Sequence, residues 1–304
     1  MDRVSPADAF ELLAADPRMD ILQSLVVARR EGRTPLSFSE LRHDTAIDDS
    51  GRFNYHLGKL VGTFVEKSEA GYDLSYAGHA IVAAVIAGTY TGSEHKSPEE
   101  LEDDCVLCGA SITARYTDGE LAVRCGNDHD LFVTSFPPGA AADMDMATLL
   151  EVASLRTYQR IEFATTGRCP ECFGELETTP TTTDIGASDG DGADDGDDEI
   201  HIFQTECRRC GERFGVSAGN YLVLAPEVVA FYRDHGVDVH YERPWTVAVA
   251  IRGRGVDDRG SAEVRVLSED PFRLQFDLEE EGDHLLVTLD DRGRVMEATR
   301  PAGT

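Results

Sequence analysis

The chain has 304 residues and a formal net charge of −29, because 57 Asp+Glu outnumber 28 Lys+Arg. A chain of this length is expected to form two or three domains. No apolar run approaches the length of a membrane helix, and none at the start of the chain reads as a signal peptide. We therefore expect a cytoplasmic protein with no membrane partner.

The charge is spread unevenly along the chain. Residues 1–92 hold 9 Lys+Arg and 13 Asp+Glu, a balance of −4, whereas residues 93–304 hold 19 and 44, a balance of −25. The abundance of acid and the scarcity of lysine resemble proteins of salt-accumulating halophilic archaea, whose carboxylate-rich surfaces retain water and cations. We interpret most of the charge as a solvated surface, and only the N-terminal part as suited to approach a polyanion.

Residues 1–92 carry the signals of five helices and one hairpin. The expected helix starts are Ser5-Pro6, Asp16-Pro17, the capping box Ser37–Glu40, Asp49 or Ser50, and Ser75. Residues 64–74, with Gly71 near the tip, are expected to form a hairpin between the fourth and fifth helices. Helix, helix, helix-turn-helix, hairpin and helix is the order of a winged helix-turn-helix domain.

The fourth helix separates into an apolar and a polar face. Phe53, Leu57, Leu60 and Val61 recur at helical spacing and are expected to face the core. At about 100° per residue, Arg52, Tyr55 and Lys59 fall on the opposite side, and Asn54 lies on its flank. Gly51, Gly58 and Gly62 share this outer face, so another surface can come close to it.

Residues 7–90 resemble haloarchaeal regulators of the ArsR-like type. The segments that carry the resemblance are Leu36-Ser37-Phe38-Ser39-Glu40-Leu41 and Phe53-Asn54-Tyr55-His56-Leu57-Gly58-Lys59-Leu60. The resemblance implies a homodimer that places the fourth helix in the major groove of double-stranded DNA and the hairpin near the backbone. Metal-sensing members carry cysteines in the third helix, but residues 40–44 contain none, which argues against metal sensing there.

Five residues are the candidate DNA contacts. Arg52 and Asn54 are shaped for bidentate contacts to base edges, arginine to guanine and asparagine to adenine. Tyr55, Lys59 and Lys67 of the hairpin are expected to meet phosphates. The alternative is that Arg52 and Lys59 are ordinary solvated charges of a surface helix.

After an acidic linker expected at residues 93–103, eight metal ligands fall into four short knuckles. The knuckles are Cys105-x-x-Cys108, Cys125-x-x-x-His129, Cys169-x-x-Cys172 and Cys207-x-x-Cys210, and they use all 7 cysteines of the chain. Three of them run into glycine, which tolerates the positive φ of a tight turn. Tetrahedral Zn²⁺ accepts both three cysteines with one histidine and four cysteines, so we expect two structural zinc ions.

Other uses of the cysteines fit this spacing less well. Disulfides are disfavoured in a reducing cytoplasm, and a redox Cys-x-x-Cys normally starts a helix after a βαβ pattern. A catalytic zinc keeps one ligand position open, and no His-Glu-x-x-His motif is present. Knuckles one with two and three with four is the nearest-neighbour pairing, and an interleaved pairing stays open.

The knuckles divide the rest of the chain. Residues 104–166 are expected to form a zinc ribbon followed by a helix at 144–164, and residues 167–224 a second ribbon. Residues 178–199 are rich in aspartate and glycine, contain no basic residue, and are expected to be a disordered loop. Residues 225–304 open with a helix at Pro226 and continue with alternating stretches at 245–251, 264–266, 272–278 and 285–289, which predict an antiparallel meander covered on one face by helices. The fold class is thus α+β.

Taken together, these patterns predict a sequence-specific DNA-binding transcriptional regulator with two structural zinc ions. Dimerisation, effector binding and contact with the transcription machinery are the roles open to its C-terminal region. The alternative is a zinc-stabilised protein-interaction adaptor whose winged helix binds protein, a role that the acidic C-terminal two-thirds would suit. We do not expect an enzyme, since no catalytic set of Ser, His and Asp and no phosphate-binding loop is found, and no catalytic residue is assigned.

Overall fold

The computed structural model describes residues 5–90, 92–184, 199–240, 242–247 and 261–301. The chain divides into two compact units, which are treated separately below. The N-terminal unit comprises Met1–Ser93 and Pro137–Ala140, and the C-terminal unit comprises Glu94–Phe136 and Ala141–Thr304. Every sheet in the described residues is antiparallel, and helices occur in both units, so the expected α+β class is confirmed.

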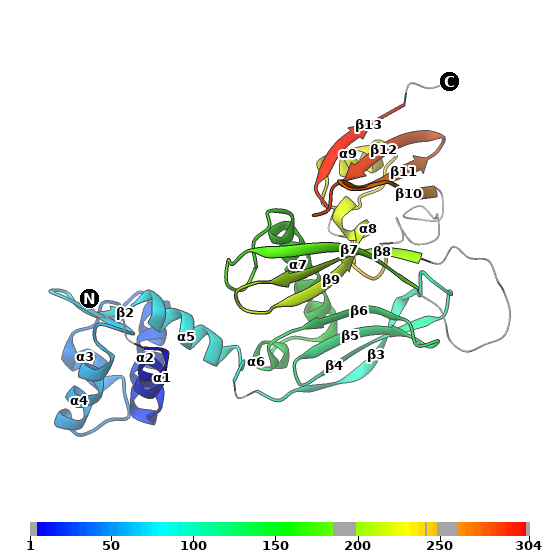
Figure 1. Cartoon of the computed structure of the whole chain (residues 1–304). Coiled ribbons are helices and arrows are strands. Elements are labelled where there is room, and N and C mark those ends of the chain that lie inside the picture. Colours follow the sequence, from blue (N-terminus) through cyan, green and yellow to red (C-terminus); the bar gives the residue numbers. More distant parts are fainter. Residues whose placement is uncertain (1–4, 91, 185–198, 241, 248–260, 302–304) are drawn as a thin grey trace. The chain divides into compact units, whose positions relative to one another are not determined.

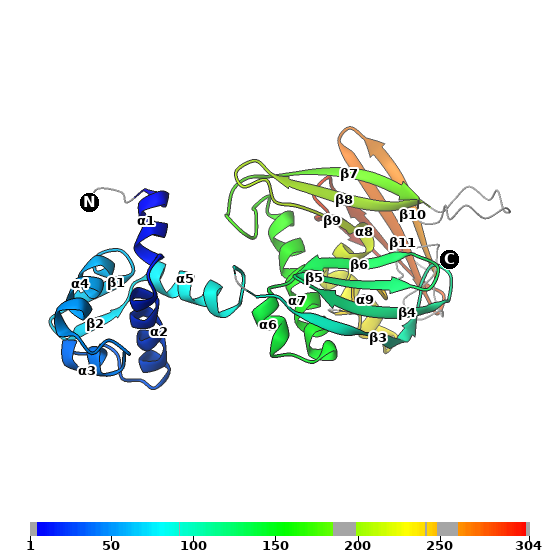
Figure 2. The same cartoon turned by 90° about the horizontal axis from the view of Figure 1, so that it is seen from below.

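Residues 5–90 of the N-terminal unit form five helices and a two-stranded hairpin (Figure 2). Its elements are α1 (Pro6–Leu13), α2 (Asp16–Arg30), α3 (Phe38–His43), α4 (Ser50–Leu60), β1 (Val65–Ser68), β2 (Gly71–Leu74) and α5 (Tyr76–Ile86). Helix α2 is the centre of the unit, because it contacts α1, α3, α4 and α5. Its Ile21, Leu22 and Leu25 are fully buried with Phe53 and Leu60 of α4.

The helix starts of this unit follow the caps predicted from the sequence. The side chain of Ser5 accepts a hydrogen bond from the Asp8 N–H, and that of Asp49 accepts one from the Arg52 N–H. At α3 the predicted capping box is confirmed, because Ser37 Oγ accepts from the Glu40 N–H while the Glu40 carboxylate accepts from the Ser37 N–H. These bonds satisfy backbone donors that an uncapped first turn leaves unpaired.

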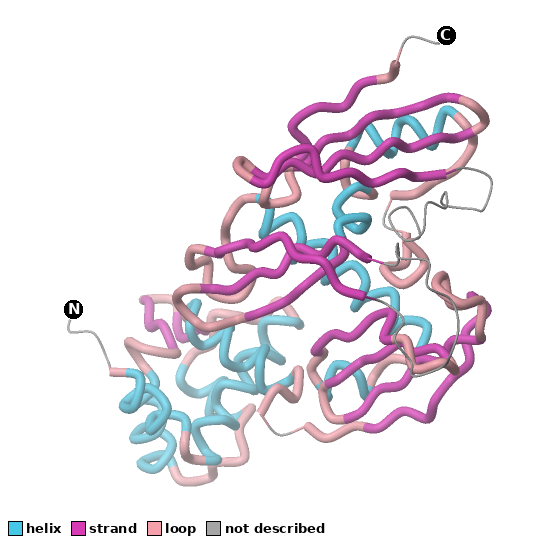
Figure 3. Tube along the Cα trace, turned by 45° about the vertical axis from the view of Figure 1, so that its right-hand side comes forward, coloured by secondary structure: helices cyan, strands magenta, loops and turns pink. Residues whose placement is uncertain are grey.

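The C-terminal unit contains three antiparallel sheets (Figures 1 and 3). The first sheet has β3 (His95–Asp104), β4 (Ser111–Thr117), β5 (Glu120–Cys125) and β6 (Asp130–Ser135). The second has β7 (Leu176–Asp184), β8 (Glu199–Cys207) and β9 (Arg213–Ser217), and the third is a meander of β10 (Ser261–Glu269), β11 (Phe272–Glu280), β12 (Asp283–Leu289) and β13 (Val295–Thr299). The long helix α7 (Met146–Thr165) follows the first sheet in sequence. The short helix α6 (Pro138–Ala142) comes before it, and residues 138–140 of α6 belong to the N-terminal unit.

The largest apolar core of this unit joins the meander to its helices. Helices α8 (Ala218–Leu222) and α9 (Pro226–Asp234) contribute Leu222, Phe231 and Tyr232, all fully buried. They pack with Phe276 and Val287 of the meander, and α9 lies against β12 (Figure 3). The expected meander covered by helices is therefore confirmed.

Three sequence predictions are corrected here. The expected linker 93–103 is largely strand β3, whose Lys96 and Leu101 are partly buried while most of its carboxylates face outward as on a solvated edge strand. Of the expected disordered loop 178–199, residues 178–184 and Glu199 belong to β7 and β8, since an unbroken ladder runs from Leu176↔Cys207 to Asp184↔Glu199. Residues 185–198 lie outside the described residues.

The third correction concerns the meander itself. Residues 244–246 form a turn rather than a strand, Trp245 and Val247 are buried, and residues 248–251 of the predicted strand lie outside the described residues. The fourth strand is instead β13, which pairs with β12. Its alternation is interrupted by Glu297, and Met296 is exposed, so the sequence pattern is weak.

Candidate functional site

The first group of predicted ligands meets at the end of the first sheet. Cys105 follows β3, Cys125 ends β5 and His129 directly precedes β6. The distance from His129 Nδ1 to Cys125 Sγ is 3.2 Å and to Cys105 Sγ 3.5 Å, while Cys108 Sγ and Cys125 Sγ are 3.9 Å apart. All four ligand atoms lie within 4.8 Å of one another.

The second group repeats this arrangement with four sulfurs. Cys169 and Cys172 precede β7, Cys207 ends β8 and Cys210 precedes β9. The Cys169 and Cys210 sulfurs are 3.7 Å apart, and the Cys172 and Cys207 sulfurs 3.5 Å. The ligands thus group by nearest neighbours along the chain, and the interleaved pairing is not the one found.

The three Cys-x-x-Cys knuckles each form the same type of backbone turn. In each, the residue after the second cysteine donates its N–H to the carbonyl of the first cysteine, at 2.7 Å for Gly109, 2.9 Å for Phe173 and 3.0 Å for Gly211. These residues have φ of +71°, +57° and +76°, the left-handed region that favours glycine. The predicted positive φ therefore occurs at Gly109 and Gly211, whereas in the third knuckle Phe173 adopts it.

Gly174 of the third knuckle has a different reason to be glycine. A Cβ at this position would lie 2.8 Å from the Arg209 Cβ and 3.2 Å from the sulfurs of both Cys172 and Cys207. The sulfurs and the opposite knuckle close over the backbone, so only a residue without a side chain fits.

Hydrogen bonds to sulfur stabilise the thiolate form of one cysteine in each group, whereas burial raises the pKa of Cys105 and Cys169. The pKa of Cys207 falls to about 6, chiefly because the N–H of Cys210 and also that of Arg209 point at its sulfur. Burial alone raises the pKa of Cys108, but the Ala110 N–H and the Asn127 amide outweigh it and lower this pKa to about 6. The Asn127 amide nitrogen lies 3.4 Å from the Cys108 sulfur.

These distances fit a tetrahedral metal site and exclude disulfide bonds. Zn–S bonds of about 2.3 Å place two sulfurs of a tetrahedron roughly 3.8 Å apart, close to the spacing found, whereas a disulfide needs about 2.05 Å. Both groups are therefore compatible with a structural zinc or another metal that prefers thiolate. With four protein ligands each, neither leaves a position for substrate, and bound zinc would supply only cross-links between knuckles.

The candidate DNA contacts of the N-terminal unit are exposed. Arg52, Asn54, Tyr55 and Lys59 lie on the outer side of α4, while Phe53, Leu57 and Leu60 are buried. Lys67 is exposed on β1, and its Nζ lies 5.5 Å from the ring centre of Tyr72. The predicted division of α4 into two faces is thus found.

Arg160 is one of several buried polar residues that the sequence analysis did not predict. Arg160 of α7 is only 8 % exposed, its guanidinium lies 4.5 Å from the ring centre of Phe214, and it forms an ion pair with Glu212. The sequence contains a signal for its burial, because Arg160 lies seven residues after Ala153 and three after Thr157, on the buried stripe of the helix. A charge on an apolar stripe marks a residue with a specific partner.

The structure so far defines an α+β protein with two cysteine-rich groups that could hold a metal ion, and the family follows from sequence comparison. Residues 102–295 match the model of a domain of unknown function, DUF7351, and the chain belongs to that family. Residues 6–85 match a second domain of unknown function, DUF7347. No curated protein and no solved structure matches the chain. No helix in the described ranges is both long and apolar enough to cross a membrane.

Proposed function

We propose that this protein is a sequence-specific DNA-binding transcriptional regulator of the ArsR-like winged helix-turn-helix type, acting as a homodimer. The observation that carries the proposal is the outer face of α4. In a chain of net charge −29, this 11-residue helix carries Arg52 and Lys59 and no carboxylate. A cationic, polar helix on an otherwise acidic protein suits contact with a polyanion.

The arrangement around α4 supports the same reading. Helix α3 and helix α4 both pack on α2, and the hairpin β1–β2 follows directly, which is the order of a helix-turn-helix with its wing. A Cβ on Gly58 would meet nothing within 4 Å, so the outer face of α4 is open to a close partner. The major groove, about 12 Å wide, admits a helix of this kind.

We assign different roles to the exposed side chains. Arg52 and Asn54, in the first half of α4, would read base edges, since both present paired hydrogen-bonding groups. Lys59 Nζ lies 5.7 Å from the Tyr55 ring centre, so the ring restrains the cation for a phosphate contact. Lys67 on the hairpin would contact a phosphate beside the groove. The two metal groups take no part in this contact and act as structural zinc sites.

The test is selection of a binding site from a random duplex library by the full-length zinc-loaded protein, followed by affinity measurements on the selected duplex. Arg52→Ala should weaken binding roughly 5–150-fold, corresponding to about 1–3 kcal/mol, and relax preference at one base pair. Lys59→Ala should weaken binding to all sequences alike. Arg30→Ala, at the exposed end of α2, removes the same charge and should leave specificity unchanged.

Two results would decide against this function. If no sequence is enriched by the wild type, or if Arg52→Ala and Arg30→Ala behave alike, α4 does not read DNA. A protein partner captured through α4 would then favour the adaptor, a role that fits the balance of −25 in residues 93–304. The buffer should contain molar KCl, because the acidic composition resembles that of proteins that work in concentrated salt.

A further inference from the structure

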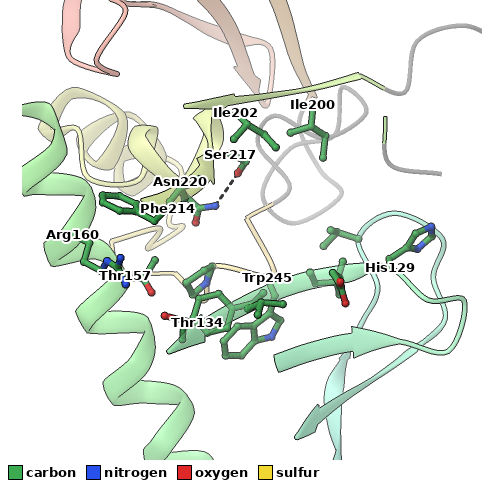
Figure 4. A pocket seen from close by; sticks show the side chains of 18 of the residues that line it. His129, Thr134, Thr157, Arg160, Ile200, Ile202, Phe214, Ser217, Asn220 and Trp245 are labelled. Carbon is green, nitrogen blue, oxygen red and sulfur yellow. Dashed lines mark hydrogen bonds between the residues drawn. The ribbon is translucent and has the colours of Figure 1, made fainter. Parts of the chain in front are cut away.

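The C-terminal unit contains a cavity of about 810 Å³, whose lining includes the candidate metal ligand His129 but none of the cysteines. Figure 4 shows it between α7, with Thr157 and Arg160, the strand β8, with Ile200 and Ile202, and Trp245. Strand β6 lines it as well, through Val133 and its neighbours. Pockets that hold small organic ligands typically measure about 300–1,000 Å³, so this volume suits one.

One side of the cavity is polar and held in place. The guanidinium of Arg160 stacks on Phe214 and is paired through Nη2 with Glu212, while its Nε has no hydrogen-bond partner among the described residues. Arginine has five N–H donors, and a buried donor without a partner is unusual in a native structure. Since the Glu212 side chain is 33 % exposed, this carboxylate can turn toward solvent when another acceptor arrives.

The walls around Trp245 are apolar, while Glu120, Asp128 and Asp130 add carboxylates elsewhere in the lining. Ile200, Ile202 and Val216 of the second sheet line the cavity together with Phe132 and Trp245, whose rings are 5.6 Å apart. A hydrogen bond restrains the Trp245 indole, because its Nε1–H donates to the Asp103 carboxylate at 3.3 Å. An apolar wall with a cationic group beside it is complementary to an amphipathic anion.

We propose that this cavity binds a small amphipathic organic acid. The apolar body would lie between the isoleucines of β8 and Trp245, and the carboxylate would accept hydrogen bonds from Arg160, whose planar donors match its two oxygens. The inference goes beyond the proposed function and does not require DNA binding. It assigns to the DUF7351 part of the chain a ligand site that shares His129 with the first metal group but includes none of the cysteines.

The cavity carries its own spectroscopic probe, because Trp245 is the only tryptophan in the chain. The experiment is a titration of the full-length, zinc-loaded protein with 4-phenylbutyrate and, separately, with 4-phenylbutan-1-ol, followed by Trp245 emission and by calorimetry. The two compounds share an apolar body and differ in the acid group. We expect both to change the emission and the acid to bind about tenfold more tightly.

Substitutions then show which residue causes the preference for the acid over the alcohol. Arg160→Gln should abolish the preference for the acid, whereas Arg156→Gln, one turn earlier on the same helix and outside the cavity lining, should preserve it. Val133 lines the cavity and is 47 % exposed, so Val133→Phe fills space without disturbing the core and should weaken both compounds. Arg160→Lys serves if Arg160→Gln does not fold, and should retain only part of the preference.

Three outcomes would overturn the proposal: no binding of either compound at millimolar concentration, equal affinities for acid and alcohol in the wild type, or loss of the preference in Arg156→Gln. Because every readout is made without DNA, failure here leaves the DNA-binding proposal unaffected, and the reverse also holds.

Discussion

The N-terminal unit and the second cysteine group are held together by different means. Helices and hairpin of the N-terminal unit share one continuous apolar core, in which Leu22, Phe53 and Val82 are fully buried. Around the second cysteine group, the buried cluster consists of Ala164, Leu176 and the two ligands Cys169 and Cys207. The ligands are thus themselves the core of this region, so its stability should depend on a metal while that of the N-terminal unit should not.

Metal removal is the strongest way to test this difference. A structural zinc contributes roughly 10–16 kcal/mol of apparent binding free energy, comparable to the whole stability of a domain at about 5–15 kcal/mol. Chelation should therefore unfold the knuckles and raise amide exchange over residues 105–129, 169–184 and 199–210. Residues of α2 and α4 should keep their protection, as measured by hydrogen exchange with mass spectrometry.

The same sample gives the control. Elemental analysis before chelation should find two metal ions per chain, and Cys169→Ser should lower this number to one. The contrast between the units fails if α2 loses protection together with the knuckles, or if the chelated protein keeps its exchange pattern.

A smaller effect is expected from crowding one knuckle. In Gly174→Ala the new Cβ would press on Arg209 and on the Cys172 and Cys207 sulfurs, so one of the two knuckles must move. Overpacking of this kind costs about 1–3 kcal/mol, and we expect a lower melting temperature and weaker metal retention in a chelator competition.

Gly126 provides the matched control in the other metal group. It is exposed, its φ is not positive, and a Cβ there would meet nothing within 4 Å. Gly126→Ala should therefore leave melting temperature and metal retention close to those of the wild type. Equal losses in both variants would mean that the space around the sulfurs does not matter.

How far the sequence predicted this architecture depends on the range of the interactions involved. The caps at Ser5, Ser37 and Asp49 and the eight ligands are local signals, since each depends on residues within four positions, and the structure shows them in place. The sequence predicts a linker where β3 lies, because the acidic residues of this segment are typical of a linker. The segment becomes a strand through its pairing with β4, and that pairing forms only in the folded chain. Likewise, Phe173 at positive φ is fixed by the knuckle and not by its own propensity.

Arg160 shows, at a candidate site, that contacts between residues far apart in the sequence are not predicted by local patterns. Its position on the buried stripe of α7 can be read from the sequence, but its partners Glu212 and Phe214 lie more than fifty residues away. The cavity that it lines is formed by elements of the first and second sheets together. No local pattern contains that information.

A third and weaker effect on stability should depend on pH, through the buried carboxylate of Asp290 in the meander. Burial alone raises the pKa of Asp290, but hydrogen bonds from the Arg294 side chain and the backbone N–H groups of Arg294 and Arg292 outweigh it and lower this pKa. A lowered folded-state pKa stabilises the protein above the unfolded-state pKa of about 3.9, and this contribution is lost as pH falls through the folded value.

Asp290→Asn should therefore cost about 1–2 kcal/mol near neutral pH, because a buried acceptor of charge-assisted bonds becomes neutral. The deficit relative to wild type should shrink below pH 4, as the wild-type carboxylate is protonated. Denaturant unfolding at a series of pH values measures both, and a deficit independent of pH would contradict the role of the charge. Asp291→Asn, on the neighbouring exposed residue, is the control.

The smallest expected effect tests the independence of the N-terminal unit. Ser37→Ala removes the acceptor for the Glu40 N–H and breaks the capping box of α3, which should cost about 1 kcal/mol. Because α3 packs on α2 within the metal-free core, the loss should lower the unfolding midpoint of this unit in chelated as well as in metal-loaded protein. Ser50→Ala, at the first residue of α4, where Asp49 supplies the cap, should have less effect in the same urea titration. If Ser37→Ala instead changed metal retention, the two units would share one folding transition, and the stability of the apolar unit could not be separated from that of the cysteine groups.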